Sequence, residues 1–202
     1  MAATSPAELS LKGTITMQGS PGSGHAELGL ALSPRLGMRV LDTSVLVNYV
    51  AERGLKSGFF VEPDEGKVRL KDDRSSHAIQ NWLTGDAGLF RYRATKKDPL
   101  IFSLFAGSHN ISRRPMAEQT GTFNRARIEK AAAALIYDPS IRRAFGYVIR
   151  DGIRQLGSPI LVTHMPGGEL VGQAHHKLVV AARYEEAAEY RVRRGTSAWW
   201  NK

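Results

Sequence analysis

Short runs in which apolar and polar residues alternate fill the first half of the chain, and this period of two residues predicts β-strands. The expected strands and hairpin arms cover residues 9–18, 26–32, 59–62, 67–70, 89–94 and 100–105. Two helices are expected over residues 42–53 and 75–83, each followed by a glycine that favours a helix end, Gly54 and Gly85. Apart from the extra arm at 26–32, the predicted order is strand, helix, strand, strand, helix, strand.

The second half of the chain is mainly helical in its pattern. The expected elements are a long loop at residues 107–123, helices at 125–137 and 141–156, and a final hairpin with arms at 159–164 and 171–182. Pro139 suits the first turn of the second helix, because its fixed φ angle is compatible with a helix start.

The predicted elements indicate an α+β fold with a ferredoxin-like (RRM-like) βαββαβ core, which is an antiparallel sheet with two helices on one face. We expect a single domain over residues 1–202. Residues 1–106 would form the core, and residues 107–202 would add a basic loop, two helices and a terminal hairpin. The free face of such a sheet can bind single-stranded RNA, although many unrelated proteins share this order.

The composition of the 202 residues is that of a globular protein, with 42% hydrophobic and 23% charged residues. Cysteine is absent, which excludes disulfides, a cysteine nucleophile and thiolate metal sites. No apolar run is long enough for a transmembrane helix. Residues 1–10 have Glu8, no Lys or Arg and no apolar core, so no signal peptide is expected. We therefore expect a cytoplasmic protein with no membrane contact.

Basic residues are concentrated in the middle of the chain. Residues 1–85 contain nine Lys/Arg and nine Asp/Glu, whereas residues 86–155 contain thirteen Lys/Arg and six Asp/Glu, a net charge of +7. Residues 156–202 contribute six basic and four acidic residues, which completes the total of +9. A basic block of this kind favours a polyanionic partner such as nucleic acid.

The expected helix at 141–156 has one apolar face and one basic face. At 100° per residue, Arg143, Arg150 and Arg154 lie within about 40° of one another, with Tyr147 about 20° beyond. The guanidinium group can donate two parallel hydrogen bonds to phosphate, and a tyrosine ring can stack on a base. The alternative interpretation is an ordinary solvated helix face.

Further basic residues lie around the predicted loop, and they are Arg91, Arg93, Lys96, Lys97, Arg113, Arg114, Arg125 and Arg127. In a strand, Arg91 and Arg93 share one face and Tyr92 points to the other. These residues could follow a sugar-phosphate backbone, so RNA, single-stranded or a guide RNA, is the expected partner. A mobile solvated loop is the alternative.

Four side chains could support catalysis by a metal-independent ribonuclease, and they are His109, His175, His176 and Lys177. Ala182 stands where a phospholipase-D-like nuclease needs Asp. The segment Val40–Leu46 resembles the first strand of a PIN-domain nuclease, but an N-cap before a helix explains Asp42 better. No metal site or cofactor is expected. The prediction therefore favours binding without catalysis, and a regulatory protein of a mobile element that binds duplex DNA is a further alternative.

Two segments resemble the RAMP superfamily, the RNA-binding subunits of multi-subunit (class 1) CRISPR effector complexes that act in antiviral defence. Residues 11–16 followed by Ser20–Gly24 are similar to its first strand and loop, and Leu104–Gly107 is similar to a Leu-Phe-Gly segment. The resemblance covers about the first 110 residues. It implies a subunit that binds RNA beside other protein subunits. The loop from Gly19 to Ala26 lacks the Asp of RNA-cleaving members, which implies binding without cleavage.

Overall fold

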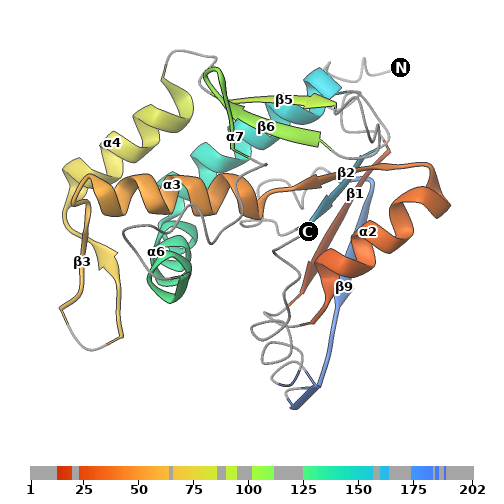
Figure 1. Ribbon diagram of the computed structural model, residues 1–202, viewed down its shortest axis with the longest axis horizontal. Coiled ribbons are helices and arrows are strands. Elements are labelled where there is room, and N and C mark those ends of the chain that lie inside the picture. The colour runs from red at the N-terminus through yellow and green to blue at the C-terminus, as the bar shows by residue number, and fades with distance from the viewer. Residues whose placement is uncertain are drawn as a thin grey trace, which may run out of the picture. The chain divides into compact units, whose positions relative to one another are not determined.

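The computed structural model describes residues 13–19, 23–63, 66–85, 90–94, 102–111, 125–156, 160–163, 174–183, 185–186 and 189 (Figure 1). The chain divides into two compact units. The first contains residues 1–43, 92–102 and 150–202, and the second contains residues 44–91 and 103–149. Both units take residues from both halves of the chain, and the expectation of one domain stays a prediction.

A four-stranded sheet forms the centre of the first unit. Its strands are β1 (Thr14–Gly19), β2 (Arg39–Asp42), β8 (Ile160–Thr163) and β9 (His176–Val180), arranged in the order β2-β8-β1-β9. Every neighbouring pair is parallel, with Thr14 opposite Ile160 and Ile15 opposite His176. All four residues of β8 are buried, as is typical of an inner strand of a parallel sheet.

The parallel pairing corrects the predicted topology. The α+β class is confirmed, but a ferredoxin-like core requires an antiparallel sheet. The two arms of the predicted final hairpin contain β8 and β9, and these strands lie on opposite sides of β1 rather than beside each other. The two arms were expected to pair with each other because they are close in sequence. Instead, each of them pairs with β1.

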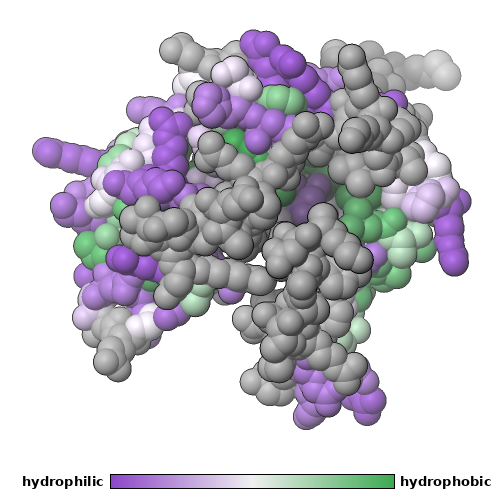
Figure 2. Space-filling view, viewed as in Figure 1, coloured by the Kyte–Doolittle hydropathy of each residue, from purple (hydrophilic) through white to green (hydrophobic). Residues whose placement is uncertain are grey.

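The segment expected as a return strand at 26–32 is helix α2 (His25–Leu36). Its buried face consists of His25, Gly29 and Ser33, which are spaced four residues apart. The alternating leucines that suggested a strand include Leu28 and Leu30, whose side chains are 41% and 47% exposed. Figure 2 shows hydrophobic residues gathered over α2. The alternation is therefore not a strand face, because residues two apart, such as Leu28 and Leu30, lie about 160° apart around α2.

Small residues let α2 approach the sheet closely. A Cβ atom added to Gly29 would lie 2.7 Å from Cγ2 of Thr163 and 3.5 Å from Cδ2 of Leu161. Beside this contact, Met17 of β1, Met38, Val40 of β2 and Leu161 of β8 form a buried cluster. The core of the first unit therefore lies between α2 and one face of the parallel sheet.

Two helices pack side by side in the second unit, α3 (Ser44–Lys56) and α6 (Arg125–Tyr137) (Figure 1). The predicted helix 42–53 is confirmed in position, but it continues past Gly54. A Cβ atom on Gly54 would lie 2.6 Å from Cε2 of Phe60, so this glycine permits close packing instead of ending the helix. The chain turns at Gly58, where φ is +69°.

The predicted hairpin and second helix of this unit are confirmed. Strands β3 (Phe60–Val61) and β4 (Arg69–Leu70) pair in antiparallel register, and residues 64 and 65 of the predicted turn lie outside the described part. Helix α4 (Asp73–Thr84) begins earlier than expected because the carboxylate of Asp72 caps it, accepting the Ser75 N–H at 2.8 Å.

A second sheet has the order β5-β6-β7, with β5 (Phe90–Ala94), β6 (Phe102–Ala106) and β7 (His109–Asn110). Strand β7 lies within the segment expected as a loop, of which residues 112–123 lie outside the described part. The two predicted C-terminal helices are confirmed as α6 and as α7 (Pro139–Leu156), which begins at the predicted proline.

Replacing Gly29 by alanine tests the packing of α2 on the sheet. Alanine stabilises an ordinary helix interior by about 1 kcal/mol relative to glycine. Here we expect Gly29→Ala to destabilise the protein by about 1–3 kcal/mol, because the new methyl group would overlap Thr163. Urea unfolding measures the change, and Leu30→Ala on the exposed side of α2 is the control. A stabilised Gly29→Ala variant would contradict this packing.

Candidate nucleic-acid interface

Helix α7 contains the predicted basic face, and its N-terminus is held by Asp138. The carboxylate of Asp138 accepts hydrogen bonds from the backbone N–H groups of Ser140 at 2.9 Å and Ile141 at 3.0 Å, and from the hydroxyl group of Ser76 at 3.2 Å. Burial alone would raise the pKa of Asp138, but these hydrogen bonds, including one from the Ser140 hydroxyl, hold it below its usual value. The start of α7 is therefore fixed by an ionised cap.

The other end of α7 is tied to the parallel sheet. The guanidinium group of Arg39 on β2 donates to the carbonyl oxygen of Leu156 at 3.1 Å. This bond satisfies one of the carbonyl groups that a helix leaves without an intrahelical partner at its C-terminus. Arg154 lies in the last turn, where a positive charge interacts favourably with the helix dipole.

The amphipathic pattern predicted for α7 is confirmed. The buried side contains Ile141, Phe145, Ile149 and Ile153, each with no exposed area. On the opposite side of the helix, Arg143 and Arg154 are exposed, Tyr147 is 61% exposed and Arg150 is half-buried. The Nε group of Arg143 also donates to the Pro139 carbonyl oxygen at 3.3 Å. We define these four residues, Arg143, Tyr147, Arg150 and Arg154, as the α7 basic face.

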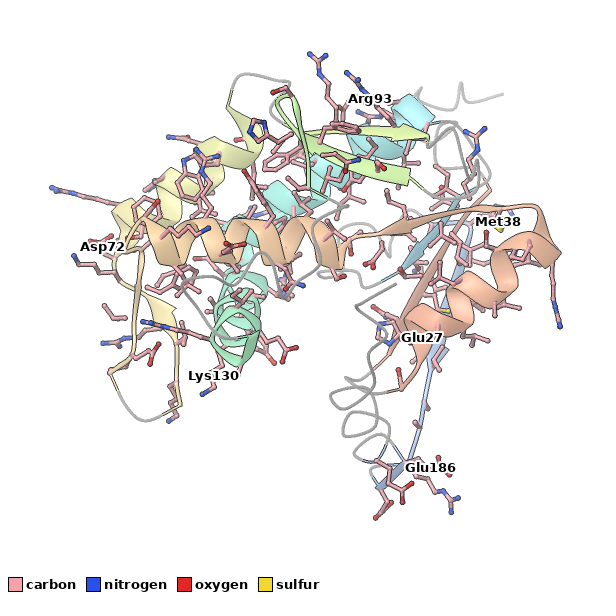
Figure 3. All side chains as sticks on the ribbon, in the orientation of Figure 1. Glu27, Met38, Asp72, Arg93, Lys130 and Glu186 are labelled. Atoms are coloured by element: carbon pink, nitrogen blue, oxygen red, sulfur yellow. The ribbon has the colours of Figure 1, made fainter. Side chains whose placement is uncertain are left out.

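Strand β5 confirms the predicted alternation, with Arg91 and Arg93 exposed and Tyr92 buried. The Tyr92 ring packs against α7 so closely that a Cβ atom on Gly152 would lie 2.2 Å from it. Gly152 lies about 180° around the helix from the arginines of the α7 basic face. Arg93, which Figure 3 labels, therefore points away from α7 on the other side of this contact. The structure places Arg93 and Arg154 on separate surfaces.

Among the remaining predicted basic residues, Arg127 alone has a described side chain. Arg127 forms an ion pair with Glu62 at 2.6 Å between its Nε and a carboxylate oxygen. Arg125 is the first residue of α6, but its side chain lies outside the described part. The other four, Lys96, Lys97, Arg113 and Arg114, also lie outside the described residues.

The catalytic candidates lie on two strands. His109 on β7 is exposed, with Nδ1 3.2 Å from the Ser108 hydroxyl. His176 and Lys177 belong to the edge strand β9, and His175 precedes it with its ring 4.5 Å from that of His176. All three residues of this second set are exposed. Within the described ranges, no group of three metal-ligating side chains gathers.

One feature of the first unit was missed by sequence reasoning. Gly19 is the last residue of β1, and Ser23 and Gly24 lie between β1 and α2, after the carboxyl end of β1, and parallel sheets commonly bind ligands at that edge. A strand followed by glycines and a helix would have been the signal. Here the buried His25 bonds the Ser23 hydroxyl at 2.9 Å, and the Thr43 hydroxyl donates to the Thr163 carbonyl oxygen at 2.9 Å. These contacts stabilise the edge.

Comparison with known proteins assigns no family. Neither a scan against protein-family models nor a search of curated proteins finds a match for this chain. Among the helices that the structure describes, none has the length and apolar character to cross a membrane.

The Asp138 cap makes a prediction about acid stability. Because the pKa of Asp138 is lowered by folding, its contribution is present above the unfolded pKa near 4 and is lost as the pH falls through the folded value. Asp138→Ala should cost about 1 kcal/mol at neutral pH, and the difference should shrink in acid. Urea unfolding at about pH 7 and pH 3 measures both values. A difference that does not depend on pH would contradict an ionised cap.

Tyr92 makes a prediction about alkaline stability. Its hydroxyl is buried with no hydrogen-bond partner among the described residues, and burial, followed by the Asp42 charge, raises its pKa above the usual range. An unfolded tyrosine ionises near pH 10, so a higher pH stabilises the unfolded state. Tyr92→Phe removes this effect. Between about pH 8 and pH 11 the variant should lose about 1.4 kcal/mol less stability than the original protein. Equal losses in urea unfolding would contradict the burial of Tyr92.

Proposed function

We propose that this protein binds single-stranded RNA without cleaving it, and that the α7 basic face is the main contact. The observation that supports the proposal is that apolar and basic side chains lie on opposite sides of helix α7. Its buried side is fully apolar, whereas the opposite side carries three arginines and one exposed tyrosine. A helix whose only role was structural would not need arginines clustered around a ring.

The chemistry of these side chains favours a single strand. Guanidinium groups bind phosphate oxygens in any nucleic acid, but a tyrosine ring can stack only on a base that has left its duplex. Tyr147 lies between Arg143 and Arg150 in sequence and on the same side of α7, so a phosphate and an adjacent base could be bound together. The net charge of +9 would also attract a polyanion over longer distances.

We further propose that the protein is one subunit of a ribonucleoprotein. Two exposed leucines of α2, Leu28 and Leu36, lie about 80° apart around the helix and offer a small apolar contact for a further protein subunit. A role in a CRISPR effector complex rests on the resemblance alone. The parallel sheet does not add to that resemblance, and the antiparallel core indicated by the predicted order of elements is not observed.

Removal of two exposed arginines tests the proposal. Relative to the original protein, Arg143→Gln/Arg154→Gln should bind a single-stranded oligoribonucleotide more weakly. The slope of log K against log salt should also become shallower by about 0.7 for each lost phosphate contact. Filter binding between about 50 and 200 mM salt measures both quantities. Stability should change by less than about 1 kcal/mol for the pair, because both side chains are exposed.

The matched control is Arg35→Gln, which removes an exposed arginine from the last turn of α2. Unchanged RNA affinity and slope in the double variant would contradict the proposal. Competition with duplex DNA of equal charge separates the alternatives, because preference for the duplex would favour a DNA-binding regulator. Shortened RNA after incubation in excess chelator would favour the histidine-dependent ribonuclease instead.

A further inference from the structure

A pocket of about 430 Å³ opens in the second unit between the β3–β4 hairpin and helix α6. The hairpin contributes Lys67, Val68 and Arg69, and the helix contributes Lys130, Ala133 and Tyr137. None of these six residues belongs to the α7 basic face. The volume falls within the range of pockets that bind small molecules.

The walls of this pocket are held in place by contacts at both sides. The ion pair of Arg127 with Glu62 joins α6 to the end of β3. At the base of the hairpin, the Phe59 ring stacks on Trp82 of α4 with centroids 5.2 Å apart. The guanidinium carbon of Arg53 lies 4.3 Å from the centroid of the same Trp82 ring. The ion pair joins the hairpin to α6, and the two ring contacts join the base of the hairpin to α4 and α3.

Three basic side chains belong to the described lining of the pocket. Lys67 and Arg69 come from the hairpin, and Lys130, labelled in Figure 3, comes from the facing helix. All three side chains are exposed, and no acidic residue is among the described residues of the lining. A Cβ atom added to Gly66 would lie 3.5 Å from Nζ of Lys130, so the charge of Lys130 is close to the hairpin backbone. Cations on two walls of one pocket can bind a phosphate group.

The rest of the lining is apolar or aromatic. Val68, Ala133 and Ala134 supply small apolar surfaces, and the Tyr137 side chain is 82% exposed beside them. An exposed tyrosine next to a flat apolar surface is suited to stacking on a planar ring. A simple anion would use the cations but would leave this half of the pocket without a partner.

We propose that this pocket binds a nucleotide, with the phosphate on Lys67, Arg69 and Lys130 and the base against Tyr137 and the neighbouring alanines. This site goes beyond the RNA contact proposed for α7 and does not depend on it. The bound nucleotide can be free in solution or part of an RNA strand, since both present the same phosphate and base.

Binding of AMP to the full chain, measured by isothermal titration calorimetry, tests the proposal. Ribose 5-phosphate, which lacks the base, and adenosine, which lacks the phosphate, are the comparison ligands. We expect AMP to bind more tightly than either one. Lys130→Gln should weaken AMP binding at least about tenfold through loss of a charged hydrogen bond. Tyr137→Ala should weaken it about tenfold through loss of stacking, and Tyr137→Phe should restore it.

The matched control is Lys71→Gln, because Lys71 is exposed in the same unit and does not line the pocket. The Arg143→Gln/Arg154→Gln protein should keep its AMP affinity, so failure of the α7 proposal and failure of this one are distinguishable. Displacement of AMP by a single-stranded oligouridine would identify RNA as the source of the nucleotide, and no displacement would identify a free nucleotide. Equal binding of AMP and ribose 5-phosphate, unchanged affinity in Tyr137→Ala, or no AMP binding would overturn the assignment.

Discussion

Strand β1 is the element on which the first unit depends, because strands from the far end of the chain pair with it on both sides. Without β1, neither β8 nor β9 would have this partner, and the surface on which α2 packs would be lost. The same sheet provides Arg39, which binds the last carbonyl group of α7. Residues 150–156 of α7, which belong to this unit, are therefore anchored to a sheet that depends on the pairing of β1.

The exposed arginines of α7 follow from how the opposite side of the helix is packed. Tyr92 contacts Gly152 so closely that no larger residue fits, and the isoleucines beside it are fully buried. A helix fixed in this way has no freedom to turn its arginines inward. The protein thus presents a cationic surface on α7, and a cationic pocket with an aromatic wall between the β3–β4 hairpin and α6. Both surfaces combine positive charge with tyrosine, which is the combination that binds phosphate and base.

Local sequence signals predicted much of the structure. The helices α6 and α7 and the β3–β4 hairpin were found because periodicity, proline and turn residues act over a few positions. Segment 26–32 was misread because the exposed leucines of α2 imitate strand alternation. The parallel sheet was missed because β1 pairs with residues about 145 positions away, which no local pattern encodes. The α7 basic face was visible in one helix, whereas the pocket depends on the packing of a hairpin against α6.

Photocrosslinking tests the central claim about α7 most directly. A single-stranded RNA that contains 4-thiouridine would be bound to the full chain, irradiated and digested with trypsin, and the modified peptides would be identified by mass spectrometry. Cleavage after Arg143 and Arg150 releases residues 144–150, a peptide that contains Tyr147. The account predicts a nucleotide adduct on this peptide that disappears with excess unlabelled RNA. Crosslinks found only on other peptides would contradict the claim that α7 contacts the strand.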